Sequence, residues 1–158
     1  MLLRLLPEQI SEQWDTIKPT IEESLRSACE DADMNEVLTS LLNASSQCWV
    51  SSRKADNGGN IIEGIIITII TRDLFGEGRN LLIYSLFGYS METKEAWRGG
   101  AKALALFAKS TQCSRITAYT DVPSLLKLVE NLGGTANQRF ISIPVDALLE
   151  IPAKDERR

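Results

Sequence analysis

The chain has 158 residues, of which 44% are hydrophobic, so it holds enough apolar material for one sizeable core and is too short for two ordinary domains. Its net charge of −4 and the scattering of its 17 lysines and arginines argue against a surface that binds nucleic acid. It contains three cysteines and no histidine, which excludes His-based triads and His-containing zinc sites and favours a reducing, cytoplasmic location.

We therefore expect a single domain over 1–151, with helices within 7–42 and a sheet with its own helices over 46–145. A mobile charged tail should follow at 152–158. The most apolar segment, Ile61–Ile70, is far shorter than the roughly 20 residues that span a bilayer. The first residues also lack the long apolar region of a signal peptide. These features predict a protein without membrane attachment.

Two helices are predicted near the N-terminus. From Pro7 to about Ala28, apolar residues recur at steps of three and four, the period of one helical face. They are Ile10, Trp14, Ile17, Ile21 and Leu25. Pro19 predicts a kink or a split into two shorter helices, because proline lacks an amide and clashes with the preceding turn. A second helix is expected over Met34–Leu42, with Asn35 as a candidate cap.

Strand patterns follow. Segments 47–52 and 61–71 flank Asp56–Asn60, whose residues accept positive φ and so predict a β-hairpin. The isoleucine run is apolar on both faces, as a central strand covered by helices on each side requires. Gly64 within it indicates a bulge or a close backbone approach. A third strand is expected over 81–87.

The second half of the chain alternates helices and strands. A helix is predicted from about Met91 to Lys109, with Ser90 or Thr93 as its cap. Gly99-Gly100 in its middle costs stability, which indicates a later helix start or something packed very close. Then follow a strand over 115–119, a helix over 123–132 capped by Gly133, and a strand over 138–144. This order predicts an α/β (α+β) fold, a mixed, mainly antiparallel sheet with helices on both faces.

The segment Thr111–Val145, read as strand, helix and strand, resembles the C-terminal half of the GNAT superfamily of N-acetyltransferases. In that family a buried strand leads to a helix that ends in Leu-Gly-Phe before a final strand, and Leu132-Gly133 stands at the Leu-Gly position. Val129 then stands where many active members carry a tyrosine that reprotonates the leaving thiolate. Gly134 replaces the usual phenylalanine. The resemblance covers roughly 28–145.

The chain is also similar to acetyltransferase-like proteins encoded by bacteriophages. The positions that carry this likeness are Trp14, Cys48-Trp49, Gly64–Thr71 and Cys113–Ile116. It implies a divergent, phage-encoded type of GNAT protein, located in the cytoplasm of a bacterial or infected cell or in the virion.

The GNAT resemblance implies an acetyl-CoA site, with the diphosphate on a glycine-rich turn that opens the central helix. The only similar string begins Arg98-Gly99-Gly100 and lies later than the family's helix length would place it. Segment 92–97 stands at the expected position and carries two acids and no glycine, so acetyl-CoA should bind weakly or not at all. If the cofactor binds, its contacts are expected from Phe87, Gly88 and the Arg98–Gly100 string.

Catalysis on an amine would need a general base and an acid. By position the candidates are Glu63, Glu92 and Tyr119, and each also has an ordinary structural interpretation. Glu63 can simply lie in solvent, Glu92 can stabilise a helix N-terminus, and Tyr119 can pack at the rim. Cys113 is expected to be a small buried hydrophobe rather than a nucleophile. The sequence shows no metal-ligand cluster.

Two classes of function stay open. The favoured one is a GNAT-like fold with a degenerate acetyl-CoA site, acting as a binding or virion-assembly module through self-association or a protein partner. Its contact surface would include the first helix and the face that carries Trp14. The other interpretation of this face, which is favoured, is that the protein's own sheet covers it. The alternative is an active acetyl-CoA-dependent N-acetyltransferase on an unknown amine.

Overall fold

The computed structural model describes residues 1–88, 94–120, 123–136 and 143–149. The chain divides into two compact units, Met1–Ala118 and Tyr119–Arg158. The first unit contains β1 (Leu2–Leu5), α1 (Pro7–Leu25), α2 (Met34–Leu42), β2 (Ser46–Lys54), β3 (Asn60–Arg72), β4 (Arg79–Gly88), α3 (Lys94–Ser110) and β5 (Arg115–Ala118). The second contains α4 (Pro123–Asn131) and α5 (Val145–Leu149). The expectation of one domain over 1–151 stays a prediction.

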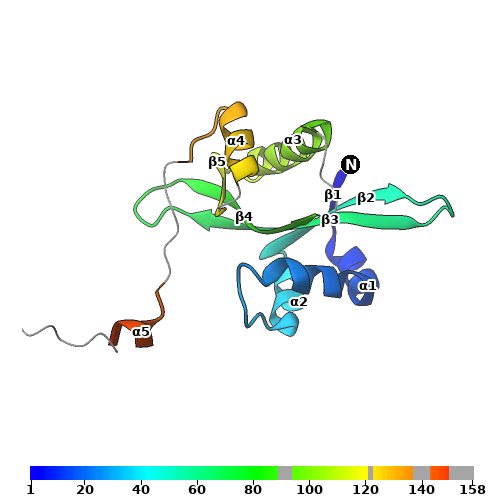
Figure 1. Cartoon of the computed structure of the whole chain (residues 1–158), viewed down its shortest axis with the longest axis horizontal. Coiled ribbons are helices and arrows are strands. Elements are labelled where there is room, and N and C mark those ends of the chain that lie inside the picture. The colour runs from blue at the N-terminus through cyan, green and yellow to red at the C-terminus, as the bar shows by residue number, and fades with distance from the viewer. Residues whose placement is uncertain (89–93, 121–122, 137–142, 150–158) are drawn as a thin grey trace, which may run out of the picture. The chain divides into compact units, whose positions relative to one another are not determined.

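The first unit is built on a sheet with the strand order β1-β2-β3-β4-β5 (Figure 1). Strands β1 to β4 pair antiparallel with their neighbours, and β5 pairs parallel to β4. The parallel pair is joined through α3, because parallel strands need a long crossover connection. The predicted mixed, mainly antiparallel sheet is confirmed, including the strands expected over 47–52, 61–71, 81–87 and 115–119.

Two parts of the predicted sheet differ. The sequence interpretation missed β1, which pairs with β2 from Leu2 to Leu5. Four residues are too few to show a strand period, and the apolar run was weighed only as a possible signal peptide. The strand predicted over 138–144 falls largely on 137–142, which lie outside the described residues. Ile143 and Pro144 are described, lie in no strand and directly precede α5.

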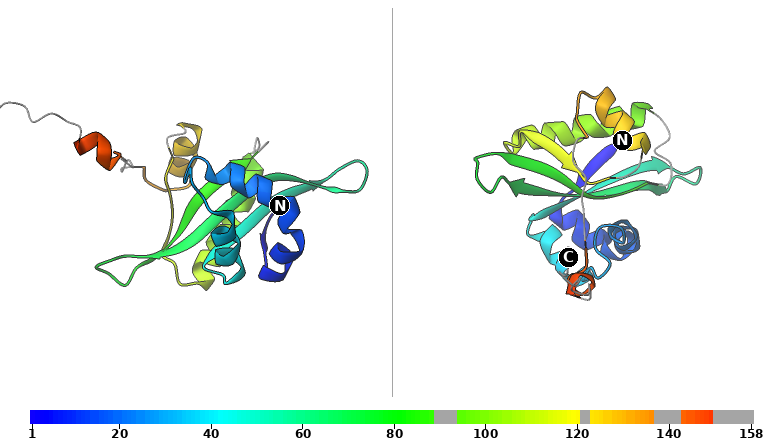
Figure 2. Two further views of the ribbon diagram at one scale, coloured as in Figure 1. Left: turned by 90° about the horizontal axis from the view of Figure 1, so that it is seen from below. Right: turned by 60° about the vertical axis from the view of Figure 1, so that its left-hand side comes forward.

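Helices cover both faces of the sheet and create two separate cores (Figure 2). On one face α1 and α2 pack on β2 and β3, with Ile10, Ile17, Ile21, Leu25, Leu41, Cys48, Ile65 and Ile67 buried. On the other face Leu104 and Ala108 of α3 pack with Leu2, Trp49, Ile66 and Leu81. Ile65 is 0% exposed and Ile66 is 4% exposed. The prediction that β3 is buried on both faces is therefore confirmed.

The N-terminal helices agree with the sequence patterns except at one cap and at Pro19, where the alternative of a split into two shorter helices is wrong. α1 runs through Pro19 as one helix, and Ile17, Ile21 and Leu25 on either side of the proline are all buried in the same core. The burial of this stripe offsets the hydrogen bond that proline removes. The cap of α2 is Asp33 and not Asn35, because the Asp33 carboxylate accepts the Asn35 backbone N–H at 2.8 Å.

A buried hydrogen-bond network joins β2 and β3 beneath α3. The Trp49 indole Nε1–H donates to Thr68 Oγ1 at 3.0 Å, and that hydroxyl donates to Gln47 Oε1 at 2.8 Å. The Trp49 ring meets Phe107 of α3 edge to face, with centroids 5.3 Å apart. Arg4 of β1 lies 4.8 Å from the centroid of the same Phe107 ring. Polar and aromatic contacts thus fix α3 over β1, β2 and β3.

Candidate functional site

β4 contains a bulge at Tyr84. Ser85 pairs with Ile67 and Ile83 pairs with Thr68, so Tyr84 is an extra residue against two consecutive positions of β3. The side-chain directions also indicate a bulge. In a regular strand, even- and odd-numbered residues face opposite sides of the sheet, yet Leu81, Ile83 and Leu86 all contact the core beneath α3. The bulge therefore reverses the alternation of β4 at one point.

The ladder between β4 and β5 stops at this bulge. Its last pair is Ile83 with Ala118, whereas β4 continues to Gly88. We call Tyr84–Gly88 the β4 terminal segment. Because β4 and β5 are parallel and α3 connects them, the carboxyl ends of both strands meet at the edge where α3 begins. Open α/β sheets bind ligands at such an edge, and helix N-termini favour anions there.

The Arg98-Gly99-Gly100 string lies inside α3 and forms no turn. The helix is described from Lys94, so Arg98 lies one turn in, with Arg98 and Gly99 exposed and Gly100 buried. A Cβ added at Gly100 would lie 3.7 Å from Leu2 Cδ2 of β1. This is ordinary van der Waals distance, and a Cβ added at Gly99 would meet nothing within 4 Å, so the very close packing expected at the glycine pair is not found. The neighbour of Gly100 is β1, the strand that the sequence interpretation missed.

Three of the predicted catalytic and cofactor residues lie near one another on β3 and β4, because Gly64, the neighbour of Glu63, pairs with Gly88, and Ile65 pairs with Phe87. Glu63 lies at a second bulge, which is in β3 and lies beside Gly64 as expected. Its carboxylate pairs there with Arg53 Nε at 3.0 Å. Tyr119 directly follows β5 and is 70% exposed. Phe87 packs against the core beneath α1 and α2, and Gly88 ends β4. Glu92 lies outside the described residues. The roles proposed for these residues stay predictions.

In the second unit, two departures from the GNAT pattern are linked sterically. Gly133 adopts φ +81° and caps α4 as predicted, and the N–H of Gly134 donates to the Val129 carbonyl at 2.9 Å. A Cβ at position 134 would lie 2.6 Å from Val129 Cγ1. A phenylalanine at 134 is therefore incompatible with this helix end while Val129 occupies its present position.

The described cysteines offer no activated nucleophile. Burial raises the pKa of the Cys48 thiol to about 12, which keeps it protonated at neutral pH. Cys113 is half-buried, and its sulfur lies 3.5 Å from Thr111 Oγ1. In the described ranges no group of three or more acidic or cysteine side chains is placed to hold a metal ion.

An open depression of about 420 Å³ lies at the carboxyl end of α3 and the start of β5, and its lining includes Lys109, Gln112 and Arg115. It adjoins the amino end of β5, whereas the β4 terminal segment lies at the carboxyl ends of the parallel strands. The depression and the β4 terminal segment are thus distinct sites.

Comparison of the sequence with protein-family profiles and with curated proteins finds no match. Solved structures do match. A probable acetyltransferase superposes with a TM-score of 0.66 at 13% identity, covering 92% of this chain and 97% of the other. The chain has the GNAT fold. A ribosomal-protein-alanine N-acetyltransferase from Brucella melitensis biovar Abortus 2308 gives 0.61 at 15% identity, over 91% and 97% of the two chains. An aminoglycoside N-acetyltransferase in complex with CoA gives 0.61 at 12%, over 91% and 98%.

The sequence interpretation of this GNAT-fold protein missed the bulge at Tyr84 and the end of the β4–β5 ladder. One signal was present in the sequence. Ser85 is the only serine or threonine in the apolar stretch Leu81–Phe87, and it is buried on the face opposite Ile83 and Leu86. A polar side chain in such a stretch marks a place where the strand meets a specific partner. None of the described helices is long and apolar enough to cross a membrane.

Proposed function

We propose that this GNAT-fold protein is an acetyl-CoA-dependent N-acetyltransferase that binds its cofactor along the β4 terminal segment. The observation that carries the proposal is the end of the β4–β5 ladder at Ile83 and Ala118, next to a bulge and beside the helix that connects the strands. The same fold in a solved aminoglycoside acetyltransferase is found with CoA, which supports this choice of cofactor.

The residues at this edge fit an elongated ligand that carries amides and phosphates. The backbone groups of a strand that point away from its paired neighbour can bind the amides of an extended chain, as in strand addition. Phosphates suit the amino-terminal end of α3, where backbone N–H groups and the helix dipole favour an anion. Arg98 is exposed and lies four residues, or about 6 Å of helical rise, after Lys94. We assign Arg98 to the phosphates.

Bound acetyl-CoA would supply a thioester, whose acetyl group passes to an amine as the CoA thiol leaves. The chain must then accept a proton from the amine and donate one to the sulfur. The Glu63 carboxylate is paired with Arg53 Nε at 3.0 Å, so a substrate amine would have to compete with this ion pair to reach it. Tyr119, which directly follows β5 in the chain and is exposed, stays the candidate acid.

A second candidate is a GNAT-fold module that binds without catalysis, including the phage or virion role that the sequence resemblance suggests. Val129 at the tyrosine position and the acidic, glycine-free segment 92–97 favour it. The partner surface predicted on α1 would have to use Trp14, because the other members of the apolar stripe are covered by the protein's own sheet.

Calorimetric titration with acetyl-CoA, followed by measurement of thiol release with a panel of amines, separates these candidates. Micromolar binding with release of CoA supports the enzyme, whereas binding without release from any amine supports the module. Arg98→Ala should weaken binding severalfold through the loss of a charge-assisted contact. Lys102→Ala, an exposed position one turn further along α3, is the matched control and should bind nearly as the wild type does. Absence of binding in the wild-type protein would refute the enzyme proposal.

A further inference from the structure

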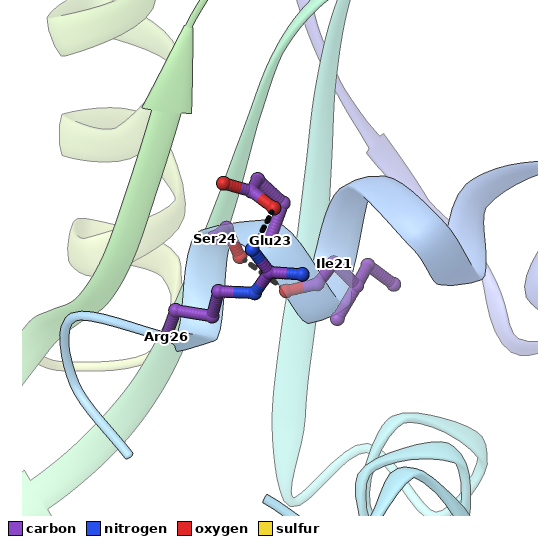
Figure 3. A network of polar contacts seen from close by, with 4 residues as sticks. All are labelled: Ile21, Glu23, Ser24 and Arg26. Carbon is purple, nitrogen blue, oxygen red and sulfur yellow. Dashed lines mark hydrogen bonds and ion pairs between the residues drawn. The ribbon is translucent and has the colours of Figure 1, made fainter. Parts of the chain in front are cut away.

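Two buried serines join α1 to the bulged strand. Ser24 is 3% exposed, Ser85 is 5% exposed, and their Oγ atoms lie 3.0 Å apart. Ser24 Oγ also donates to the Ile21 carbonyl oxygen at 2.8 Å, in the last turns of α1 (Figure 3). A hydroxyl has one proton to donate, so Ser85 must be the donor to Ser24. The chain of hydrogen bonds runs from β4 through Ser24 to the backbone of α1.

The surroundings make this pair sensitive to strand register. The neighbours of the pair include Ile21 and Leu25 of α1 and Ile67, which is the cross-strand partner of Ser85. Side chains alternate between the faces of a strand, so moving the bulge by one residue can turn Ser85 to the opposite face. Both serines would then lose the partner that satisfies them in an apolar core, which is costly.

We propose that the Ser24–Ser85 pair is a positioning device that fixes the β4 bulge at Tyr84. Through the bulge it sets the direction of the backbone N–H and C=O groups in the β4 terminal segment. This inference rests on the proposed function, because those backbone groups are the ones assigned to acetyl-CoA. Neither serine touches the ligand in this account; each acts through the backbone of β4.

Paired substitutions isolate the hydroxyl from the volume of the side chain. Ser85→Thr keeps a hydroxyl, whereas Ser85→Val places a side chain of nearly the same shape as threonine there without a hydroxyl. Ser24→Ala removes the oxygen that accepts the hydrogen bond from Ser85. The structure supplies a matched control in Ser46, a buried serine of β2 whose Oγ accepts a hydrogen bond from Ser40 of α2 at 2.9 Å. Ser46→Ala removes a similar helix-to-strand pair away from the bulge.

The readout is the affinity for CoA, measured together with the melting temperature. Ser85→Val and Ser24→Ala should each weaken CoA binding by about fivefold or more, the factor that matches the loss of one hydrogen bond. Ser85→Thr should restore affinity, and Ser46→Ala should lower the melting temperature without changing affinity. Wild-type affinity in Ser85→Val, or an equal loss in Ser46→Ala, would overturn the proposal.

Nuclear magnetic resonance tests the register without a ligand. Cross-strand contacts between Ile83 and Thr68 and between Ser85 and Ile67 report the position of the bulge. They should persist in the wild type and in Ser85→Thr, and should be lost or broadened in Ser85→Val and Ser24→Ala. If the wild type binds no CoA but the contacts change as expected, the proposed function fails while the positioning role stands. Contacts that are the same in all variants would refute the positioning role.

Discussion

Replacement of the glycine pair in α3 by alanine separates a structural role from a phosphate-binding role. Gly99 is exposed, and an added Cβ there would meet nothing within 4 Å. At Gly100 an added Cβ would lie 3.7 Å and 3.9 Å from Leu2 side-chain atoms, which is ordinary van der Waals contact. Alanine is favoured over glycine inside a helix by about 1 kcal/mol, so the double variant should gain up to about 2 kcal/mol.

This gain is measurable by urea unfolding followed by circular dichroism. Each 1 kcal/mol should raise the melting temperature by about 2–4 °C in a chain of this length. Gly100→Leu is the contrasting variant, because its side chain must displace Leu2, and overpacking should cost about 1–3 kcal/mol. A lower stability of Gly99→Ala, or loss of acetyl-CoA binding in that variant, would refute the view that this glycine is only a helix residue.

Three further predictions concern the two cores. Thr68→Val should destabilise the protein by about 1–3 kcal/mol, because it leaves the buried Trp49 N–H and the Gln47 side-chain oxygen without their shared partner. A smaller loss in chemical denaturation would show that water replaces the hydroxyl. Because the pKa of Cys48 is raised in the folded protein, only the unfolded chain ionises this thiol between pH 9 and about 12. The free energy of unfolding should therefore fall by up to about 1.4 kcal/mol per pH unit as the pH rises through that window. Cys48→Ala should remove this slope, and an unchanged slope would assign it to other groups. Trp14→Ala should cost about 2 kcal/mol, roughly half the loss for a fully buried tryptophan, because its ring is half-buried against the α1–α2 core; an unchanged melting temperature would contradict this packing.

The sequence predicted the parts of the fold that depend on repeated patterns. The two-faced burial of Ile65 and Ile66, the apolar stripe of α1 and the glycine cap at Gly133 all follow from local periodicity or backbone freedom. β1 was missed because it is short and gains its stability from tertiary contacts, namely its pairing with β2 and the packing of Leu2 and Arg4 against α3. Strand propensity is weak in so short a segment, and tertiary contacts decide its structure.

The candidate site was harder to predict because it depends on what strands do relative to each other. The end of the β4–β5 ladder at Ile83 depends on how the two strands pair, and the residue types in either strand do not predict it. The one string that resembles a phosphate turn, Arg98-Gly99-Gly100, lies inside α3, where neither glycine is required by close packing. Ser85 was the better indicator, because a buried hydroxyl in an apolar strand requires a partner.

Chemical-shift mapping with CoA shows where on the protein the cofactor binds. We predict that CoA shifts the backbone amide signals of Tyr84–Gly88 and of the first turns of α3 around Arg98, and leaves those of Lys109–Ile116 unchanged. Shifts confined to the depression lined by Lys109 and Arg115, or no shifts at millimolar CoA, would contradict the account.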